Sequence, residues 1–220
     1  MQDETNIHGN RSHAVRAQRI EPADSLDFFP TPPWATRALC EFMLNNDLIY
    51  STDAVWEPAC GDGAMSRTLS EYFPLTYETD IHYYGCGVGG IDFLSDDAVP
   101  ADARRLTSWA ISNPPFNLAE AFALRGLELA RKGVALLVRT SFLEGIGRHE
   151  RLFSCHPPAY VLQFSERVPM FKGRLSKTGT TATSYCWVIW PKHKPASTQL
   201  QWIAPCRKRL ERDEDYGAAE

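Results

Sequence analysis

The tetrapeptide Asn113-Pro114-Pro115-Phe116 combines residue types that suit chemistry on an amino nitrogen. An amino group attached to a ring or a carbonyl is a poor nucleophile because its lone pair is delocalised. Two acceptors that hold its two hydrogens favour a tetrahedral nitrogen, and the Asn113 side-chain oxygen and the Pro114 carbonyl can supply them. Consecutive prolines fix φ and lack N–H groups, so the turn is stiff and preorganised. Phe116 offers a flat face to a base, a stack worth about 1–3 kcal/mol, although a strand-ending turn with Phe116 in the core is the structural alternative.

A second segment, Glu57-Pro58-Ala59-Cys60-Gly61-Asp62-Gly63, has the composition of a ligand-binding loop. It follows a short apolar run and precedes a helix-forming run. Small residues allow the backbone to approach a ligand closely, and a helix N-terminus offers free N–H groups to an anionic group. Asp80 ends the next apolar run, where a carboxylate can accept hydrogen bonds from both hydroxyls of a ribose. The pattern predicts a nucleoside-containing cofactor.

Two other kinds of nucleotide-binding loop are disfavoured. Gly85, Gly87 and Gly90 match G-x-G-x-x-G literally, but no strand–turn–helix pattern surrounds them, so we interpret this stretch as a loop. The loop that ends at Gly63 lacks the third glycine of a dinucleotide-binding turn, and no G-x-x-x-x-G-K-[S/T] sequence occurs. The sequence therefore disfavours both a dinucleotide-dependent dehydrogenase and a kinase with this kind of phosphate-binding loop.

Charge is distributed unevenly along the chain. The 220 residues carry a net charge of −4, which is not the strongly basic balance typical of nucleic-acid-binding proteins. The segment from Arg139 to Lys177 nevertheless contains seven basic and three acidic side chains, a net charge of +4. Such a patch can neutralise phosphates while an aromatic ring stacks on a base, although a solvated loop explains any single residue equally well. The candidate nucleic-acid contacts are Arg139, Arg148, Arg167, Phe171, Lys172, Arg174 and Lys177.

Length and composition bound the remaining classes. A chain with 44% hydrophobic and 23% charged residues suits one globular domain. The longest aliphatic run, Val134–Val138, has five residues, which is too short for a transmembrane helix, and residues 1–19 lack the apolar core of a signal peptide. The six cysteines form no C-x-x-C pair, so we expect free thiols, a cytoplasmic location and no metal site.

The apolar periodicity predicts an α/β chain with a central, mostly parallel sheet. Helical spacing begins at Trp34 and is expected again over residues 64–72, 118–131 and 147–154. Strands are expected over residues 54–57, 75–79, 109–112, 134–139, 160–164 and 185–190. In such sheets ligands bind beyond the carboxyl ends of the strands. The candidate residues Glu57–Gly63, Asp80 and Asn113–Phe116 lie at the ends of the expected strands.

The ordered motifs resemble those of the S-adenosylmethionine (SAM)-dependent methyltransferases. Glu57–Gly63 looks like motif I of that family, and Asn113–Phe116 looks like motif IV of its members that methylate exocyclic or amide nitrogens. Phe29-Pro30-Thr31-Pro32-Pro33 resembles the segment that precedes motif I in DNA adenine methyltransferases. The resemblance covers residues 28–190, and residues 134–190 also resemble small phage- and prophage-type DNA adenine methyltransferases. It implies a Rossmann-like class I methyltransferase fold, with a mostly parallel seven-stranded sheet and helices on both faces.

The resemblance implies roles for the matched acidic positions. Glu57 would meet the amino-acid end of SAM, and Asp80 would hold its ribose. Asp92 would accept a hydrogen bond from the adenine amino group of the cofactor. Phe93 and Ile81 would pack on the two faces of the purine, although core packing explains these two residues when they are taken alone.

Backbone and proline positions complete the implied site. Thr31 and Pro32 would close over the methionine portion of SAM, with a helix entry as the alternative role of this segment. The implied cofactor-binding residues are Phe29, Thr31, Pro32, Glu57, Ala59, Cys60, Gly61, Gly63, Asp80, Ile81, Asp92, Phe93 and Asn113. The implied catalytic residues are Asn113, Pro114, Pro115 and Phe116.

The implied reaction is methyl transfer to the N6 amino group of adenine in DNA. A base within a duplex would have to be flipped out, or the substrate would be single-stranded. The same chemistry on RNA adenine or on a protein glutamine remains open, as does a binding module without catalysis. Motif IV of cytosine N4-methyltransferases usually has Ser at the position of Asn113, which disfavours that reaction.

Chain length limits how much of the protein can be devoted to reading a target sequence. We expect a mobile arm over residues 1–25, a catalytic domain over residues 26–192 with nucleic-acid contacts around residues 140–180, and a charged tail over residues 193–220. No separate recognition domain fits into this plan. We therefore expect a short or relaxed target sequence.

Overall fold

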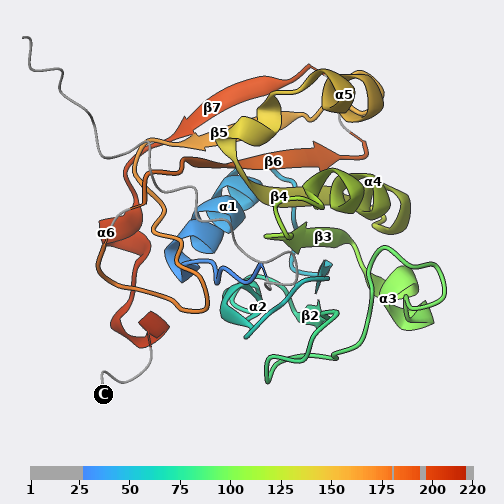
Figure 1. Cartoon of the computed structure of the whole chain (residues 1–220), viewed down its shortest axis with the longest axis horizontal. Helices are drawn as coiled ribbons and strands as arrows, with labels where there is room; N and C mark the ends of the chain where they lie inside the picture. The colour runs from blue at the N-terminus through green and yellow to red at the C-terminus, as the bar shows by residue number, and fades with distance from the viewer. Residues whose placement is uncertain (1–26, 180, 194–196, 217–220) are drawn as a thin grey trace, which may run out of the picture.

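The computed structural model describes residues 27–179, 181–193 and 197–216, so the arm expected over residues 1–25 lies outside the described residues. The helices are α1 (Pro33–Asn45), α2 (Ala64–Leu69), α3 (Ala101–Leu106), α4 (Ala119–Leu129), α5 (Ile146–Arg148) and α6 (Arg207–Leu210), with the short helical turns η2 (Thr140–Leu143), η3 (His149–Phe153) and η4 (Asp213–Tyr216). The strands are β1 (Ala54–Glu57), β2 (Leu75–Glu78), β3 (Trp109–Ser112), β4 (Gly133–Arg139), β5 (Tyr160–Phe164), β6 (Tyr185–Pro191) and β7 (Gln199–Ile203) (Figure 1).

The strands form one seven-stranded sheet in the order β2-β1-β3-β4-β6-β5-β7. Strand β1 pairs in parallel with β2 and β3, β3 pairs in parallel with β4, and β5 pairs in parallel with β7. Strand β6 lies between β4 and β5 and is antiparallel to both. The expectation of a mostly parallel seven-stranded sheet is confirmed. A purely Rossmann-like strand order is not observed, because antiparallel β6 inserts beside β4.

The burial of β4 and β6 explains the position of this insertion. Six of the seven residues in each of these strands are buried, so neither strand suits an edge that faces water on one side. Pairing between them extends from Gly133 opposite Pro191 to Arg139 opposite Tyr185, and it places both strands in the middle of the sheet. The edge positions are held by β2 and β7, whose side chains are largely exposed or half-buried.

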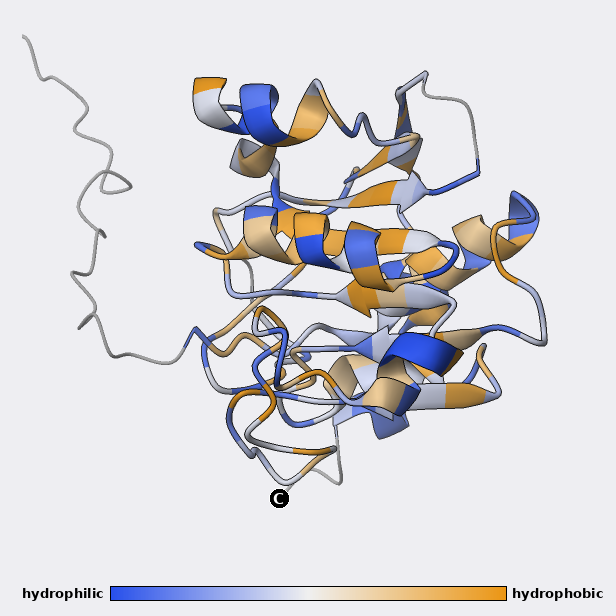
Figure 2. Ribbon diagram, turned by 90° about the vertical axis from the view of Figure 1, so that its right-hand side faces the viewer, coloured by the Kyte–Doolittle hydropathy of each residue, from blue (hydrophilic) through white to orange (hydrophobic). Residues whose placement is uncertain are grey.

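Alternate side chains of the sheet enter two separate cores. On β4, Ala135 and Leu137 pack in the core that also contains residues of α1, α2 and α6. Val134, Leu136 and Val138 pack in the opposite core, which contains residues of α3, α4 and η3. Figure 2 shows hydrophobic residues concentrated along the central strands of this layered arrangement. The expectation of helices on both faces of the sheet is confirmed.

The segment that was expected to be a charged tail contributes to the domain. Strand β7 pairs with β5 over five positions, from Tyr160 opposite Gln199 to Phe164 opposite Ile203. Helix α6 follows and buries Leu210 in the core that contains α1. The boundary expected at residue 192 was therefore wrong. Because β7 lies at the edge of the sheet, many of its residues are exposed and polar, and this composition is also typical of a tail.

A buried arginine fastens this C-terminal segment to α1. The side chain of Arg37 is only 3% exposed, and it donates hydrogen bonds to the Leu210 carbonyl at 2.8 Å and to both carboxylate oxygens of Asp215 at 2.7 Å. A second carboxylate, Glu71, accepts a 2.7 Å bond from the same guanidinium. Because a buried charge is stable only when it is paired, the segment up to Asp215 is part of the folded unit.

Candidate functional site

A cavity of about 370 Å³ lies at the carboxyl ends of β1 and β3, where the sequence predicted a ligand site. Its walls come from the segment before α1, the loops after β1 and β2, and the turn after β3. Eleven of the thirteen implied cofactor-binding residues line it: Phe29, Thr31, Glu57, Ala59, Cys60, Gly61, Asp80, Ile81, Asp92, Phe93 and Asn113. The parallel strands thus bring together residues up to 84 positions apart in the chain.

Glu57 places a carboxyl group in the wall of this cavity. It is the last residue of β1, it is 2% exposed, and the Ser66 hydroxyl donates a hydrogen bond to it. Burial raises the pKa of the Glu57 carboxyl well above its ordinary value, and the nearby acids Glu78 and Asp80 raise this pKa further. A buried carboxylate held by a neutral donor is a favourable partner for a cationic group.

Asp80 and Gly61 join the first two loops of the cavity. The Gly61 N–H donates to Asp80 Oδ2 at 2.9 Å, and the His82 N–H donates to Asp80 Oδ1 at 2.9 Å. A carboxylate has about four acceptor positions, so Asp80 retains capacity for hydroxyl donors. Gly61 has φ +53°, and an added Cβ would lie 2.5 Å from the Phe28 ring. The loop therefore requires glycine at this position.

The three residues expected around a purine differ in their surroundings. Phe93 is 2% exposed and packs edge-on against Trp56, with ring centroids 5.0 Å apart, so it belongs to the core as well as to the cavity wall. Asp92 Oδ1 accepts a 2.9 Å hydrogen bond from the Leu94 N–H, which fixes the carboxylate at the rim. Ile81 is 55% exposed and is available to cover a ligand.

Two implied cofactor residues, Pro32 and Gly63, do not line the cavity. Pro32 is the N-cap of α1, and its carbonyl accepts a hydrogen bond from the Ala35 N–H. Gly63 is the N-cap of α2 with φ +82°, and an added Cβ would lie 2.5 Å from the Cys86 sulfur. Both residues shape the start of a helix, and their contribution to the site is indirect.

Asn113 presents an unpartnered acceptor in the wall of the first cavity. Its Nδ2 donates to the Phe29 carbonyl at 2.9 Å, which fixes the orientation of the amide. Its Oδ1 is buried and has no hydrogen-bond partner. Buried polar atoms are nearly always paired, so an unpaired one in a ligand cavity marks a position where a donor is expected. Pro115 lines the same cavity, whereas Pro114 is buried beside it.

A second cavity, of about 420 Å³, adjoins the first at Asp27, which lines both. Phe116 forms part of its wall, together with Arg139, Phe142 and Arg148. The Phe116 N–H donates to Asp27 Oδ2 at 2.7 Å, and this bond holds the turn against the segment that precedes α1. The Asn-Pro-Pro-Phe turn therefore contacts both cavities, with Asn113 and Pro115 in the wall of the first and Phe116 in the wall of the second.

The predicted nucleic-acid residues fall into separate groups. Arg139 and Arg148 line the second cavity, and the Nε atom of each is buried without a hydrogen-bond partner. Phe171 is half-buried and lies under Arg174, whose guanidinium carbon is 5.9 Å from the ring centroid. Lys172 is exposed on the same turn. Because the Gly173 N–H donates to the Phe28 carbonyl at 2.9 Å, this turn also touches the first cavity's wall.

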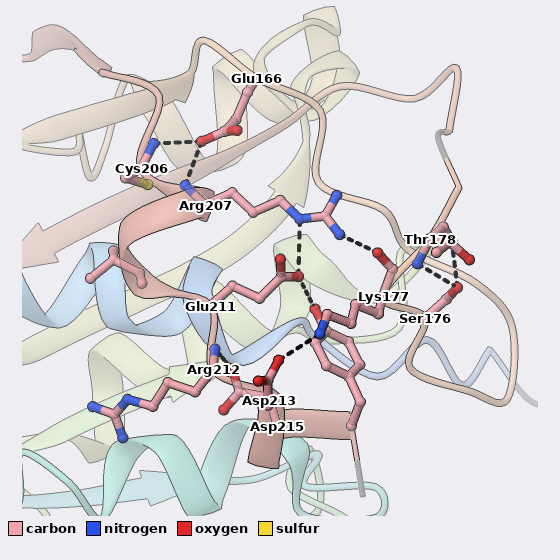
Figure 3. A network of polar contacts seen from close by, with 12 residues as sticks. Glu166, Ser176, Lys177, Thr178, Cys206, Arg207, Glu211, Arg212, Asp213 and Asp215 are labelled. Atoms are coloured by element: carbon pink, nitrogen blue, oxygen red, sulfur yellow. Dashed lines mark hydrogen bonds and ion pairs between the residues drawn. The ribbon is translucent and has the colours of Figure 1, made fainter. Parts of the chain in front are cut away.

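The remaining two predicted contacts are engaged within the protein. Arg167 donates to the Ala182 carbonyl at 2.9 Å and to the Ser184 hydroxyl at 2.5 Å. Lys177 forms an ion pair with Asp213 at 2.6 Å. Figure 3 shows the surrounding network, in which Arg207 donates to the Lys177 carbonyl at 2.7 Å. Acidic residues of the C-terminal segment thus neutralise part of the positive charge that the sequence assigned to this region.

Sequence reasoning missed two aromatic residues of the site. Phe28 and Tyr84 line the first cavity, and their rings stack with centroids 4.6 Å apart. Phe28 is adjacent to the recognised Phe29–Pro33 segment, so its position was a signal that extending that segment by one residue would have captured. Tyr84 lies in the irregular stretch after Asp80, where no periodicity or motif distinguishes one aromatic residue from another.

The described residues include neither a metal-binding cluster nor a membrane-spanning helix. No group of three or more His, Cys, Asp or Glu side chains in that part of the chain is arranged to hold a metal ion. None of the helices in the described ranges combines the length and the apolar character needed to cross a membrane. All six cysteines are free thiols.

No protein-family model and no curated protein matches the sequence. Solved structures do match. The methyltransferase subunit of a type I restriction-modification system from Streptococcus thermophilus has a TM-score of 0.59 and 11% identity, over 86% of this chain and 49% of that chain. A protein assigned as a class I SAM-dependent methyltransferase from Listeria monocytogenes also has a TM-score of 0.59 and 11% identity, over 82% of this chain and 67% of that chain. A protein assigned as an RNA methyltransferase from Pyrococcus horikoshii has a TM-score of 0.55 and 15% identity, over 79% of this chain and 91% of that chain.

The chain has the class I methyltransferase fold. This fold places a ligand beyond the carboxyl ends of its parallel strands, which is where both cavities lie. The chain spans about half the length of the restriction-modification subunit that it matches. The resemblance to phage- and prophage-type enzymes has no counterpart among these matches and stays a prediction.

Proposed function

We propose that this protein transfers a methyl group from SAM to the N6 amino group of adenine in DNA, with a short or relaxed target sequence. The observation that carries the proposal is the buried, unpartnered Oδ1 of Asn113, which lines the first cavity and belongs to a side chain oriented by the Phe29 carbonyl. An acceptor in that state suits an N–H donor, and an exocyclic amino group supplies two.

The residues of the first cavity fit the cofactor. Glu57, buried and held by one neutral hydroxyl, would pair with the ammonium group of the methionine portion. Asp80 would accept from the ribose hydroxyls, and Asp92 would accept from the adenine amino group. Phe93 and Ile81 would cover the purine. When bound, SAM supplies an electrophilic methyl group.

The chain's own residues prepare the nucleophile. Asn113 Oδ1 and the Pro114 carbonyl would each accept one hydrogen of the amino group, which draws the nitrogen toward a tetrahedral geometry. The stiff Pro114-Pro115 turn holds the Pro114 carbonyl in place before the substrate arrives, so little reorganisation is required. No strong general base is needed, because the nitrogen becomes acidic only as the new bond forms and its proton can leave to water.

Several observations favour a nucleic acid as the substrate. Two arginines line the second cavity, and a basic turn around Phe171 touches the wall of the first cavity. One solved structure of this fold is the methyltransferase subunit of a type I restriction-modification system, and another is assigned as an RNA methyltransferase. DNA is preferred because the Phe29–Pro33 segment resembles that of DNA adenine methyltransferases. The free thiols suit a reducing compartment such as the cytoplasm.

A panel of methyl acceptors tests this proposal. The protein is incubated with tritiated SAM and, in separate reactions, with duplex DNA, single-stranded DNA, RNA and a mixture of proteins. We expect incorporation into DNA that disappears with adenine-free DNA of the same length. Incorporation into RNA alone or into protein glutamine alone would replace DNA as the substrate. A thermal shift with SAM but no transfer to any acceptor would indicate a binding module.

A further inference from the structure

The ring of Phe116 is covered in this structure. The guanidinium carbon of Arg139 lies 3.7 Å from the ring centroid, a distance at which the planar cation stacks on the aromatic face. The rings of Phe29 and Tyr185 pack nearby, with centroids 5.4 and 6.0 Å away. A base that is to stack on Phe116 therefore has to displace a side chain, and Arg139 is the candidate because it lines the second cavity.

Arg139 keeps one unused donor, although its side chain also hydrogen-bonds to Tyr185. It is the last residue of β4, and its Nε atom is buried without a hydrogen-bond partner. A neighbouring arginine, Arg148, is fixed by hydrogen bonds to the Phe142 and Glu144 carbonyls at 2.7 and 2.6 Å. Its Nε is also buried without a hydrogen-bond partner, although it lies 3.9 Å from Glu120 Oε2 in an ion pair. Two guanidinium groups with unused donors in one cavity form an attractive site for a phosphate.

We propose that the second cavity receives the target base and that Arg139 closes it by stacking on Phe116. The phosphate backbone of a polynucleotide opens the cavity by drawing the guanidinium off the ring. This inference rests on the proposed function, and it adds a basis for substrate selection. A polynucleotide brings the phosphate and the base together, so the gain at the phosphate offsets the loss of the stack. A free nucleoside brings the base alone and meets a closed cavity.

Steady-state kinetics with two substrates test the selection. Wild-type protein, Arg139→Ala and Arg139→Lys are compared on an adenine-containing single-stranded oligonucleotide and on free deoxyadenosine. A cation–π stack is worth about 0.5–2 kcal/mol, so both variants should lower KM for deoxyadenosine by about 2- to 30-fold. The ratio of kcat/KM for the oligonucleotide to kcat/KM for deoxyadenosine should fall at least about tenfold in Arg139→Ala.

Salt dependence separates the stack from the phosphate contact. Loss of one phosphate contact to a single strand lowers the slope of log K against log salt by about 0.7, which we expect for Arg139→Ala. Arg139→Lys keeps the charge and should keep the slope. Arg151→Ala is the control, because Arg151 is a nearby basic residue paired with Glu120 at 2.6 Å outside the cavity. An unchanged substrate ratio in Arg139→Ala would overturn the proposal.

A binding measurement distinguishes this proposal from the proposed function. In protein labelled with ¹⁵N-arginine, the Arg139 Nε–H proton should resonate upfield because it lies over the Phe116 ring, and the signal should be absent from Arg139→Lys. An adenine-containing oligonucleotide should abolish the upfield shift, whereas deoxyadenosine at the same concentration should not. If the shift is abolished but no adenine is methylated, the displacement of Arg139 by the polynucleotide is supported and the proposed function fails. If adenine is methylated while the shift persists in the saturated complex, only the displacement of Arg139 is refuted.

Discussion

Replacing Glu57 by Gln should raise the stability of the cofactor-free protein and lower its affinity for SAM. Glu57 is 2% exposed and receives a hydrogen bond from the Ser66 hydroxyl. Burial, together with the nearby carboxylates Glu78 and Asp80, raises the pKa of its carboxyl well above the ordinary value. The ionised carboxylate is therefore costly until a cation arrives, and the ammonium group of SAM is the cation that we assign to it.

The sign of the stability effect follows from the raised pKa. The folded protein holds the Glu57 proton more tightly than the unfolded chain, so the free energy of unfolding falls as pH rises from the unfolded value of about 4.3 through the folded pKa. Gln cannot ionise and removes this fall. An uncompensated buried group costs about 1–3 kcal/mol, so the cofactor-free Glu57→Gln protein should melt several degrees higher than wild type at neutral pH.

The binding effect has the opposite sign and is larger. Truncating one member of a buried, hydrogen-bonded charge pair costs about 2–5 kcal/mol, which corresponds to at least about a 30-fold loss of SAM affinity. Wild-type affinity should rise with pH toward the folded pKa of Glu57, because binding requires the ionised carboxylate. The component of the pH dependence that comes from this carboxyl should be absent from Glu57→Gln.

Titration calorimetry across a pH series and thermal melts of the cofactor-free protein measure both effects. Asp102→Asn is the control, since Asp102 is an exposed carboxylate that does not line the cavity and is not among the groups that raise the pKa of Glu57. The reasoning would be refuted by a Glu57→Gln protein that binds SAM as tightly as wild type with the same pH dependence. Loss of affinity together with a lower melting temperature would instead indicate that Glu57 is chiefly a structural residue.

Two further substitutions test the scaffold around the site. Arg37→Leu removes one partner of a buried ion-pair cluster and should lower the free energy of unfolding by about 3–5 kcal/mol in urea denaturation, whereas Arg209→Ala, at a pair whose arginine is 63% exposed, should cost less than about 1 kcal/mol. Equal effects of the two would contradict the fastening role of Arg37. Gly61→Ala should abolish measurable SAM binding because its Cβ would clash with Phe28, while Gly90→Ala, which also has positive φ but open space around it, should retain binding. Tight SAM binding by Gly61→Ala would show that the loop does not need glycine there.

The position of the first cavity was predictable from the sequence because several of its residues lie at the carboxyl ends of strands. Glu57 and Asn113 each follow or close a short apolar strand, and parallel strands bring such ends together without further information. Asp80 was placed by the same logic. The small residues of the loop predicted a close approach of the backbone to a ligand, and the positive φ of Gly61 is a further reason for glycine that the structure adds.

Other features depended on tertiary contacts that no local pattern encodes. From the sequence, Lys177 was predicted to contact phosphate. In the structure the C-terminal segment places Asp213 beside it, and the two side chains form an ion pair. Strand β7 was missed because an edge strand is only partly apolar, and its partner β5 lies about 40 residues earlier in the chain. Arg139 was recognised as basic, but its stacking on Phe116 depends on β4 extending three residues beyond the β3 pairing.

The position of the transferred methyl group tests the central claim most directly. DNA is incubated with SAM and the protein, digested to nucleosides and analysed by mass spectrometry beside N6-methyldeoxyadenosine and N4-methyldeoxycytidine standards. Wild-type protein should produce N6-methyldeoxyadenosine, and Asn113→Ala should reduce it by about 10²–10³-fold while still binding SAM, because the lost Oδ1 acceptor is the one assigned to the nucleophile. Equal methylation by Asn113→Ala, or methyl groups found only on cytosine, would contradict the proposed function.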